Sequence, residues 1–175
     1  IVEPFEYMTI ASSKKNRIGK KNESLSEVYS KFSVSRERYA DVRNEQGSLQ
    51  LVIAQKIFMP DEQSKPVRVA GLLLLLVDID AMISQYTLKY REPSTFETLL
   101  VNSNGFAISK LKYKEVDPLS YKIEALPAQL SAKGNEGIIA TTDYRGEPVL
   151  AAFRHIRLST SLGMGMVLKR DQAEV

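Results

Sequence analysis

The alternation of apolar and polar residues predicts two long strands in the first half of the chain. Between residues 49 and 59, apolar side chains recur largely at every second position, which is the period of a strand with one buried face. Residues 60–66 are rich in turn formers, and the Leu-rich run 67–77 follows as a second extended segment. We expect these two strands to pair antiparallel.

A helix is expected directly after the second strand. Apolar residues recur at three- and four-residue steps over 81–90, Asp80 stands at the N-cap position, and Pro93 ends the pattern. Upstream of the strands, residues 1–22 are polar with little periodicity, and 23–38 have only weak helical spacing. The first half therefore predicts two strands and one helix.

The second half predicts two strands, a helical crossover and three further strands. Asn104-Gly105 favours a tight hairpin turn between the first two, because both residues tolerate positive φ. Strand hairpins separated by one crossover indicate an α+β fold, an antiparallel five-stranded sheet with helices on one side. The expected elements are strands at 96–101 and 106–111, a crossover at 118–132 broken by Pro127, and strands at 137–142, 147–158 and 162–169.

Composition narrows the function classes. With 175 residues, 43% hydrophobic and 26% charged, the chain is a folded protein with one or two cores. It has no cysteine, which excludes disulfides and thiolate zinc sites. The net charge is +3, and the basic residues are distributed along the chain except for the run 14–21. We interpret this run as a solvated loop, so no nucleic-acid partner is expected. The apolar run 69–77 is shorter than the about 20 residues of a membrane helix.

Catalytic chemistry has few candidates. The sequence has one histidine, His155, and no P-loop, nucleophile elbow or dinucleotide fingerprint. His155 lies in an expected strand, where a structural position is the simpler interpretation. Asp78 and Asp80 are two apart and could share a strand face that holds a cation, but strand-ending and helix-capping roles are simpler. We expect no enzyme, no metal and no cofactor.

Three ordered segments of the second half resemble Cache and other PAS-like sensor modules. In 99–109 an apolar strand, an Asn-Ser-Asn-Gly turn and a second strand follow one another, as in the first hairpin of the family. Residues 142–156 are similar to its later hairpin, and 163–174 resemble its closing strand. The resemblance implies that 93–175 is a membrane-proximal module.

The first half resembles the family more loosely. Segments 49–59 and 67–80 look like the last two strands of the membrane-distal module of a double-Cache sensor. A recognisable first hairpin and the long N-terminal helix of the family are missing from the sequence. We therefore expect two tandem modules, with 1–92 forming a membrane-distal module that is incomplete or divergent.

The resemblance implies the extracytoplasmic ligand-sensing part of a bacterial receptor, periplasmic or extracellular, in an inner-membrane protein. It implies a small-molecule ligand such as a carboxylate or amino acid, a homodimer in the intact receptor, and membrane helices outside these residues. The output would be a histidine kinase, a chemotaxis domain or a cyclic-di-GMP enzyme. The alternative is a protein-interaction or dimerisation module without a small ligand, docking through the apolar helix at 82–90.

Candidate ligand-binding residues are those that can fix a small polar molecule in an apolar concavity. In the second module they are Tyr144, Arg154 and His155, near the hairpin at 143–147, and alternation places Arg154 on the opposite strand face from His155. In the first module they are Tyr39, Arg43 and Asp78. The resemblance gives Asp78 the acidic position that holds ligand amines, but the Arg-x-Trp-Tyr element of amino-acid-binding members is missing from this sequence.

Overall fold

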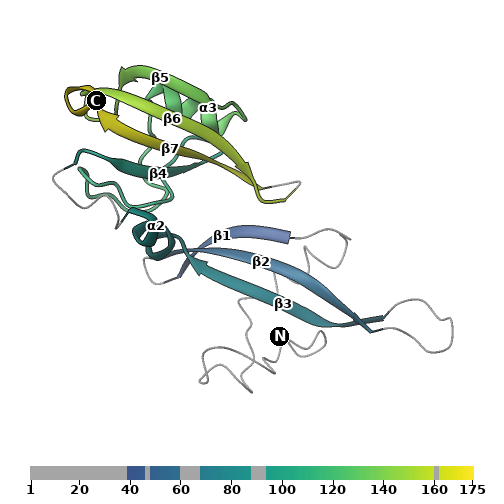
Figure 1. Cartoon of the computed structure of the whole chain (residues 1–175). Helices are drawn as coiled ribbons and strands as arrows, with labels where there is room; N and C mark the ends of the chain where they lie inside the picture. The colour runs from purple at the N-terminus through teal and green to yellow at the C-terminus, as the bar shows by residue number, and fades with distance from the viewer. Residues whose placement is uncertain (1–38, 46–47, 60–67, 88–93, 160–161) are drawn as a thin grey trace. The chain divides into compact units, whose positions relative to one another are not determined.

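The computed structural model describes residues 39–45, 48–59, 68–87, 94–159 and 162–175 (Figure 1). The strands form two sheets, one of three strands in the order β1-β2-β3 and one of four in the order β4-β7-β6-β5. Two compact units are distinguished. One contains Val52–Leu76 with the first residues of β1, and the other contains Val42–Leu51 and Val77–Val175.

The N-terminal sheet contains both strands predicted from the first half. They are β2, Ser48–Met59, and β3, Arg68–Asp78, which are neighbours in the sheet. The third strand, β1 at Tyr39–Glu45, was not predicted, and the expected helical spacing at 23–38 lies outside the described residues.

Helix α2, Ile79–Thr87, begins one residue earlier than its predicted cap. The Oδ1 of Asp78 accepts the backbone N–H of Ala81 at 2.9 Å, which is the geometry of a side-chain N-cap. Asp80, predicted to be the cap, lies inside the helix, and its Oδ1 accepts the backbone N–H of Lys110 at 2.8 Å. The capping prediction was therefore wrong by two residues.

The C-terminal sheet is built from β4 (Glu97–Asn102), β5 (Gly137–Thr142), β6 (Pro148–Arg157) and β7 (Gly163–Asp171). All of its pairs are antiparallel, and β7 lies between β4 and β6. The short 3-10 helix η4, Gln172–Glu174, follows β7.

The predicted fifth strand at 106–111 does not form. Only two isolated bridges occur there, Val101↔Ala107 and Phe106↔Lys122. The ladder ends because the backbone N–H of Leu100 is donated at 2.9 Å to the hydroxyl of Ser109, a side chain, instead of to a strand carbonyl. The sheet therefore has four regular strands and a bridged turn.

Helix α3, Leu126–Ala132, covers one face of the C-terminal sheet (Figure 1). A crossover of helix, or of loop and helix, was expected over 118–132 with a break at Pro127. Instead Pro127 lies in the first turn of α3, where a missing N–H costs no intrahelical bond. The core between α3 and the sheet consists of buried side chains from the strands, the loop before α3 and α3 itself: Leu99, Val101, Ala107, Leu111, Ile123, Ala128, Ala132, Val149, Ala151, Phe153 and Val167.

Candidate functional site

A charged residue occupies an inward position of the central strand β7. Gly165, Val167 and Lys169 alternate on the buried side of this strand. The strand register places Lys169 directly opposite Glu97 of β4 and Ala151 of β6. Directly opposed residues of antiparallel strands are within contact distance. The β4–β7 pairing therefore brings an ammonium and a carboxylate together on the buried face of the sheet.

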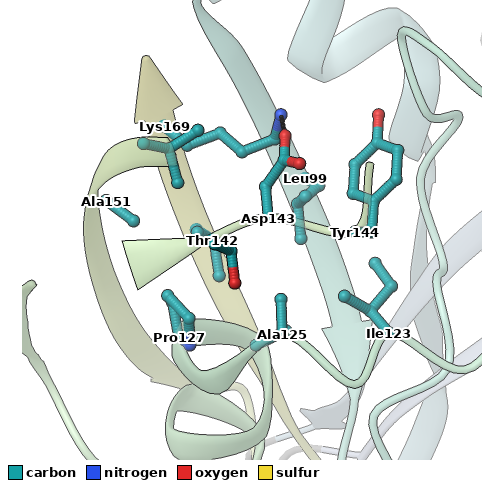
Figure 2. A pocket seen from close by; sticks show the side chains of 12 residues that line it. Leu99, Ile123, Ala125, Pro127, Thr142, Asp143, Tyr144, Ala151 and Lys169 are labelled. Atoms are coloured by element: carbon teal, nitrogen blue, oxygen red, sulfur yellow. Dashed lines mark hydrogen bonds and ion pairs between the residues drawn. The ribbon is translucent and has the colours of Figure 1, made fainter. Parts of the chain in front are cut away.

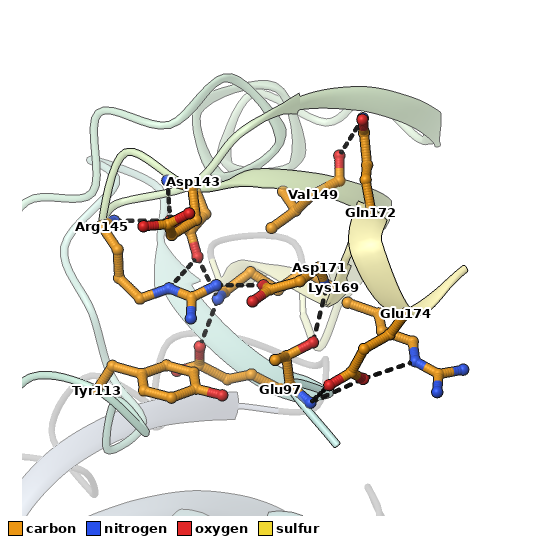
Figure 3. A network of polar contacts seen from close by, with 12 residues as sticks. Glu97, Tyr113, Asp143, Arg145, Val149, Lys169, Asp171, Gln172 and Glu174 are labelled. Carbon is orange, nitrogen blue, oxygen red and sulfur yellow. Dashed lines mark hydrogen bonds and ion pairs between the residues drawn. The ribbon is translucent and has the colours of Figure 1, made fainter. Parts of the chain in front are cut away.

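Lys169 is the centre of a buried ion-pair network (Figure 3). Its Nζ lies 2.8 Å from Oε2 of Glu97 and 2.5 Å from Oδ2 of Asp143, the residue that follows β5. The three side chains are only 2%, 3% and 2% exposed, respectively. Two negative charges and one positive charge are therefore removed from water together. Their close contacts offset the free-energy cost of this desolvation.

Two aromatic rings complete the surroundings of the ammonium. The Nζ of Lys169 lies 4.8 Å from the ring centroid of Tyr144 and 5.4 Å from that of Tyr113. The Tyr144 hydroxyl donates to the carboxylate of Glu97 at 2.8 Å and accepts the backbone N–H of Tyr113 at 3.3 Å. These ring faces stabilise a desolvated cation further.

Arg145 links this centre to the end of β7. Its Nε lies 2.6 Å from Oδ2 of Asp143, and its guanidinium also pairs with the carboxylate of Asp171. The guanidinium carbon lies 4.1 Å from the ring centroid of Tyr113. A movement of Tyr113 would therefore change a contact of Arg145, the residue that pairs with Asp171.

The segment after β7 is tied to the start of β4. The backbone N–H of Thr95 lies 3.0 Å from each carboxylate oxygen of Glu174, and the N–H of Asp171 donates to Oγ1 of Thr95 at 2.8 Å. Arg170 Nε lies 3.0 Å from Oε2 of Glu174. The chain before β4 and the chain after β7 are thus held together by side-chain contacts.

The charges of the network shift the pKa values of its members. Burial by itself raises the pKa of the Asp143 carboxyl, but hydrogen bonds from Lys169 and Arg145 outweigh burial and hold that pKa below its ordinary value. Burial and the neighbouring carboxylate of Glu97 raise the pKa of Tyr144 well above its ordinary value. Asp143 is therefore ionised and Tyr144 is a neutral donor at neutral pH.

The lowered pKa of Asp143 predicts a loss of stability in acid. The stabilisation is fully present above the unfolded-state pKa, about 3.9 for Asp, and is lost as the pH falls through the lower folded-state value. Urea unfolding followed from pH 7 to about pH 2 should show a steeper acid decline for the wild type than for Asp143→Asn. Asp117→Asn, at an exposed position, is the matched control and should keep the wild-type slope. Equal slopes for all three proteins would contradict the assignment.

The space beneath α3 is nearly filled. The cavity there has a volume of about 10 Å³, and Figure 2 shows side chains of the strands and of the segment 123–127 surrounding it. A volume of this size holds about one water molecule, not a metabolite. The apolar concavity expected to hold a small molecule is therefore not found beneath α3.

A larger concavity lies on the surface, along the segment 109–120. Its volume is about 880 Å³, and its lining combines charged and polar residues with the apolar Leu111, Val116 and Pro118. Lys112 and Tyr113 of this lining also reach the buried network, because the N–H of Lys112 donates to Glu97 Oε1 at 2.8 Å and that of Tyr113 to the Tyr144 hydroxyl. The open concavity and the buried network therefore share a wall.

The structure separates the ligand-binding residues predicted for the second module. Tyr144 belongs to the buried network. His155 lies at the C-terminal end of α3, its Nδ1 2.9 Å from the carbonyl oxygen of Ser131. Arg154 lies on the other strand face, as predicted, 74% exposed and 3.0 Å from Glu136. No single site contains all three.

The candidates of the first module are placed only in part. Asp78 caps α2, which is one of the structural roles considered for it. Tyr39 and Arg43 belong to β1, but their side chains lie outside the described residues. Their roles as ligand contacts stay predictions.

Comparison with known proteins identifies the fold. No family model matches the sequence, and no curated protein matches it either. Among solved structures, the periplasmic sensory domain of the Campylobacter jejuni chemoreceptor Tlp1 is similar, with 16% identity and a TM-score of 0.53, over 80% of this chain and 51% of that one. An extracellular ligand binding receptor from Desulfohalobium retbaense DSM5692 has 14% identity and a TM-score of 0.58, over 96% of this chain and 29% of that one.

The extracellular domain of mmHK1S-Z2, described as a histidine kinase, is also similar, with 14% identity and a TM-score of 0.51 over 79% of this chain and 52% of that one. The chain has the fold of an extracytoplasmic sensory domain. The Cache-like, PAS-like resemblance seen in the sequence is thereby confirmed for the fold. The chain spans about half the length of the chemoreceptor and kinase domains, 51% and 52%.

Within the described residues, no helix is long and apolar enough to span a membrane.

Proposed function

We propose that the chain is the ligand-sensing part of a bacterial transmembrane receptor and works outside the cytoplasm. The observation that carries the proposal is the sensory fold, combined with a polar network that runs from a surface concavity to the end of β7. The receptor would place membrane helices outside these residues, dimerise, and drive a kinase, chemotaxis or cyclic-di-GMP output. It would use tandem modules at 1–92 and 93–175.

The concavity along 109–120 is the proposed ligand site. Its volume of about 880 Å³ lies within the about 300–1,000 Å³ typical of small-molecule sites. Its lining carries Lys110, Lys112 and Lys114 beside Glu115 and Asp117, which favours a carboxylate or zwitterionic ligand over a cation.

Signal transmission would start at the shared wall. A ligand that draws Lys112 and Tyr113 outward weakens the N–H contacts to Glu97 and Tyr144 and removes the ring on which Arg145 lies. The contact between Arg145 and the end of β7 then changes as well. The ligand shifts this equilibrium only by the difference between its affinities for the two arrangements.

The test is a thermal-shift and calorimetry screen of carboxylates, amino acids, amines and sugars on the whole chain, repeated on variants. Once a binder is found, Lys110→Glu should weaken it about tenfold, or about 1.4 kcal/mol, because the substitution reverses a charge in the lining. Lys133→Glu, an exposed charge reversal at the end of α3, is the matched control and should leave the affinity unchanged.

One further outcome would place the ligand site elsewhere, and another would contradict the proposal. If Arg154→Ala abolishes binding while Lys110→Glu does not, the ligand site lies on the outer face of β6, beside Arg154. If no small molecule binds and the intact receptor ignores all of them, the concavity is not a sensor site.

The second candidate function is a dimerisation or partner-docking module without a small ligand. The nearly filled cavity beneath α3 favours it, because the interior of the C-terminal sheet leaves no room for a metabolite. Size-exclusion chromatography with light scattering would support this candidate if a stable dimer forms in the absence of every tested ligand.

A further inference from the structure

The surroundings of the Lys169 ammonium are those of a bound ligand cation. Two carboxylates contact it, from Glu97 at 2.8 Å and Asp143 at 2.5 Å. The ring of Tyr144 lies 4.8 Å away and that of Tyr113 5.4 Å away. Aromatic faces recognise ammonium ligands through cation–π attraction, and carboxylates bind them through charge-assisted hydrogen bonds.

We propose that Glu97, Asp143 and the ring of Tyr144 form an ammonium-binding cage that the chain fills with its own Lys169. The chemical class that fits the cage is a primary alkylammonium, and the lysine side chain is its permanent, covalently attached occupant. The cage is then closed to free amine ligands. This inference does not depend on whether the chain senses a metabolite.

The cage is organised by contacts that do not involve Lys169. Glu97 is held by the N–H of Lys112 and by the hydroxyl of Tyr144. Asp143 is held by Arg145, through its N–H at 2.7 Å and its Nε at 2.6 Å. Because each carboxylate keeps these donors when the ammonium is removed, the cage should persist as an empty site.

The side chain of Lys169 borders the small cavity beneath α3. Most of the side chains that line this cavity are apolar, and they include Leu99, Ala151 and Val167. A lysine truncated to alanine would leave the outline of three methylenes ending in an ammonium. The molecule that matches this outline is n-propylammonium.

The test is chemical rescue of Lys169→Ala in the whole chain. Its melting temperature, or its refolding yield if it is unfolded without additive, should increase with n-propylammonium chloride. At about ten times the dissociation constant the rise should be about 3–6 °C. The wild type should not respond, and n-propanol or sodium chloride at the same concentration should not rescue the variant. Absence of rescue, or equal rescue by propanol, overturns the proposal.

A second variant tests the same cage when the truncated protein is too unstable to study. The chain contains no cysteine, so Lys169→Cys carries a unique thiol. Aminoethylation of the unfolded variant with 2-bromoethylamine creates a thioether isostere of lysine, and S-propylation creates its uncharged counterpart. The aminoethylated protein should refold and melt near the wild type, while the S-propyl protein should melt well below it. If the two melt alike, the pocket is an ordinary apolar one and the proposal is wrong.

Discussion

Lys169→Met should lower the free energy of unfolding by about 3–5 kcal/mol at pH 7. Met keeps most of the side-chain volume, so the loss comes from charge. Glu97 and Asp143, 3% and 2% exposed, would be left facing each other without the ammonium between them. Because whole proteins are stable by only about 5–15 kcal/mol, this one substitution brings the chain close to unfolding. Urea unfolding followed by circular dichroism measures the change.

A matched triple variant separates the lost charge from lost packing. In Lys169→Met combined with Glu97→Gln and Asp143→Asn, the two buried negative charges that faced the ammonium are removed together with it, so most of the lost stability should return. A loss below about 1 kcal/mol in the single variant would match a solvent-exposed pair and would show that the ammonium is not buried.

The sequence predicted the parts of the fold that depend on local pattern. The two-residue period located β2, β3 and the strands of the second half to within a few residues. It failed at 106–111, where the pattern is apolar enough for a strand but the hydroxyl of Ser109 takes the N–H of Leu100 and ends the ladder. Hydrophobic periodicity does not reveal a hydrogen bond between a side chain and a backbone group.

The site was harder to predict because it depends on register between distant strands. Tyr144 was predicted as a ligand contact, which stays a prediction, and its place in the buried network was not foreseen. Glu97 and Asp143 were missed, since the β4–β7 pairing and the turn after β5 bring them to one lysine. A signal existed in β7: Lys169 continues the alternation of Gly165 and Val167, so a charge falls on the buried face of a central strand. A lysine there requires buried carboxylates as partners.

Gly165→Ala should lower the free energy of unfolding by about 1–3 kcal/mol through overpacking between β7 and α3. A methyl group at Gly165 would lie 2.3 Å from Oγ of Ser131, 2.8 Å from the backbone N of Ala132 and 2.9 Å from the backbone carbonyl carbon of Ser131. Two of these atoms are backbone, so α3 itself must move away from the sheet. The carbonyl of Ser131 also holds His155, and the shift would disturb that contact too.

Gly163→Ala in the same strand is the control that distinguishes a rigid from a yielding neighbour. The three atoms nearest to a methyl group there all belong to the imidazole of His155, with Nε2 at 2.2 Å, and a side chain can rotate away at smaller cost. Adding Ser131→Ala to Gly165→Ala removes the closest contact but leaves both backbone contacts, so it should restore little stability. Denaturant unfolding of the wild type, of the two glycine variants and of the double variant measures these differences in stability. Full restoration by Ser131→Ala would mean that the hydroxyl, and not the backbone of α3, sets how closely helix and sheet approach.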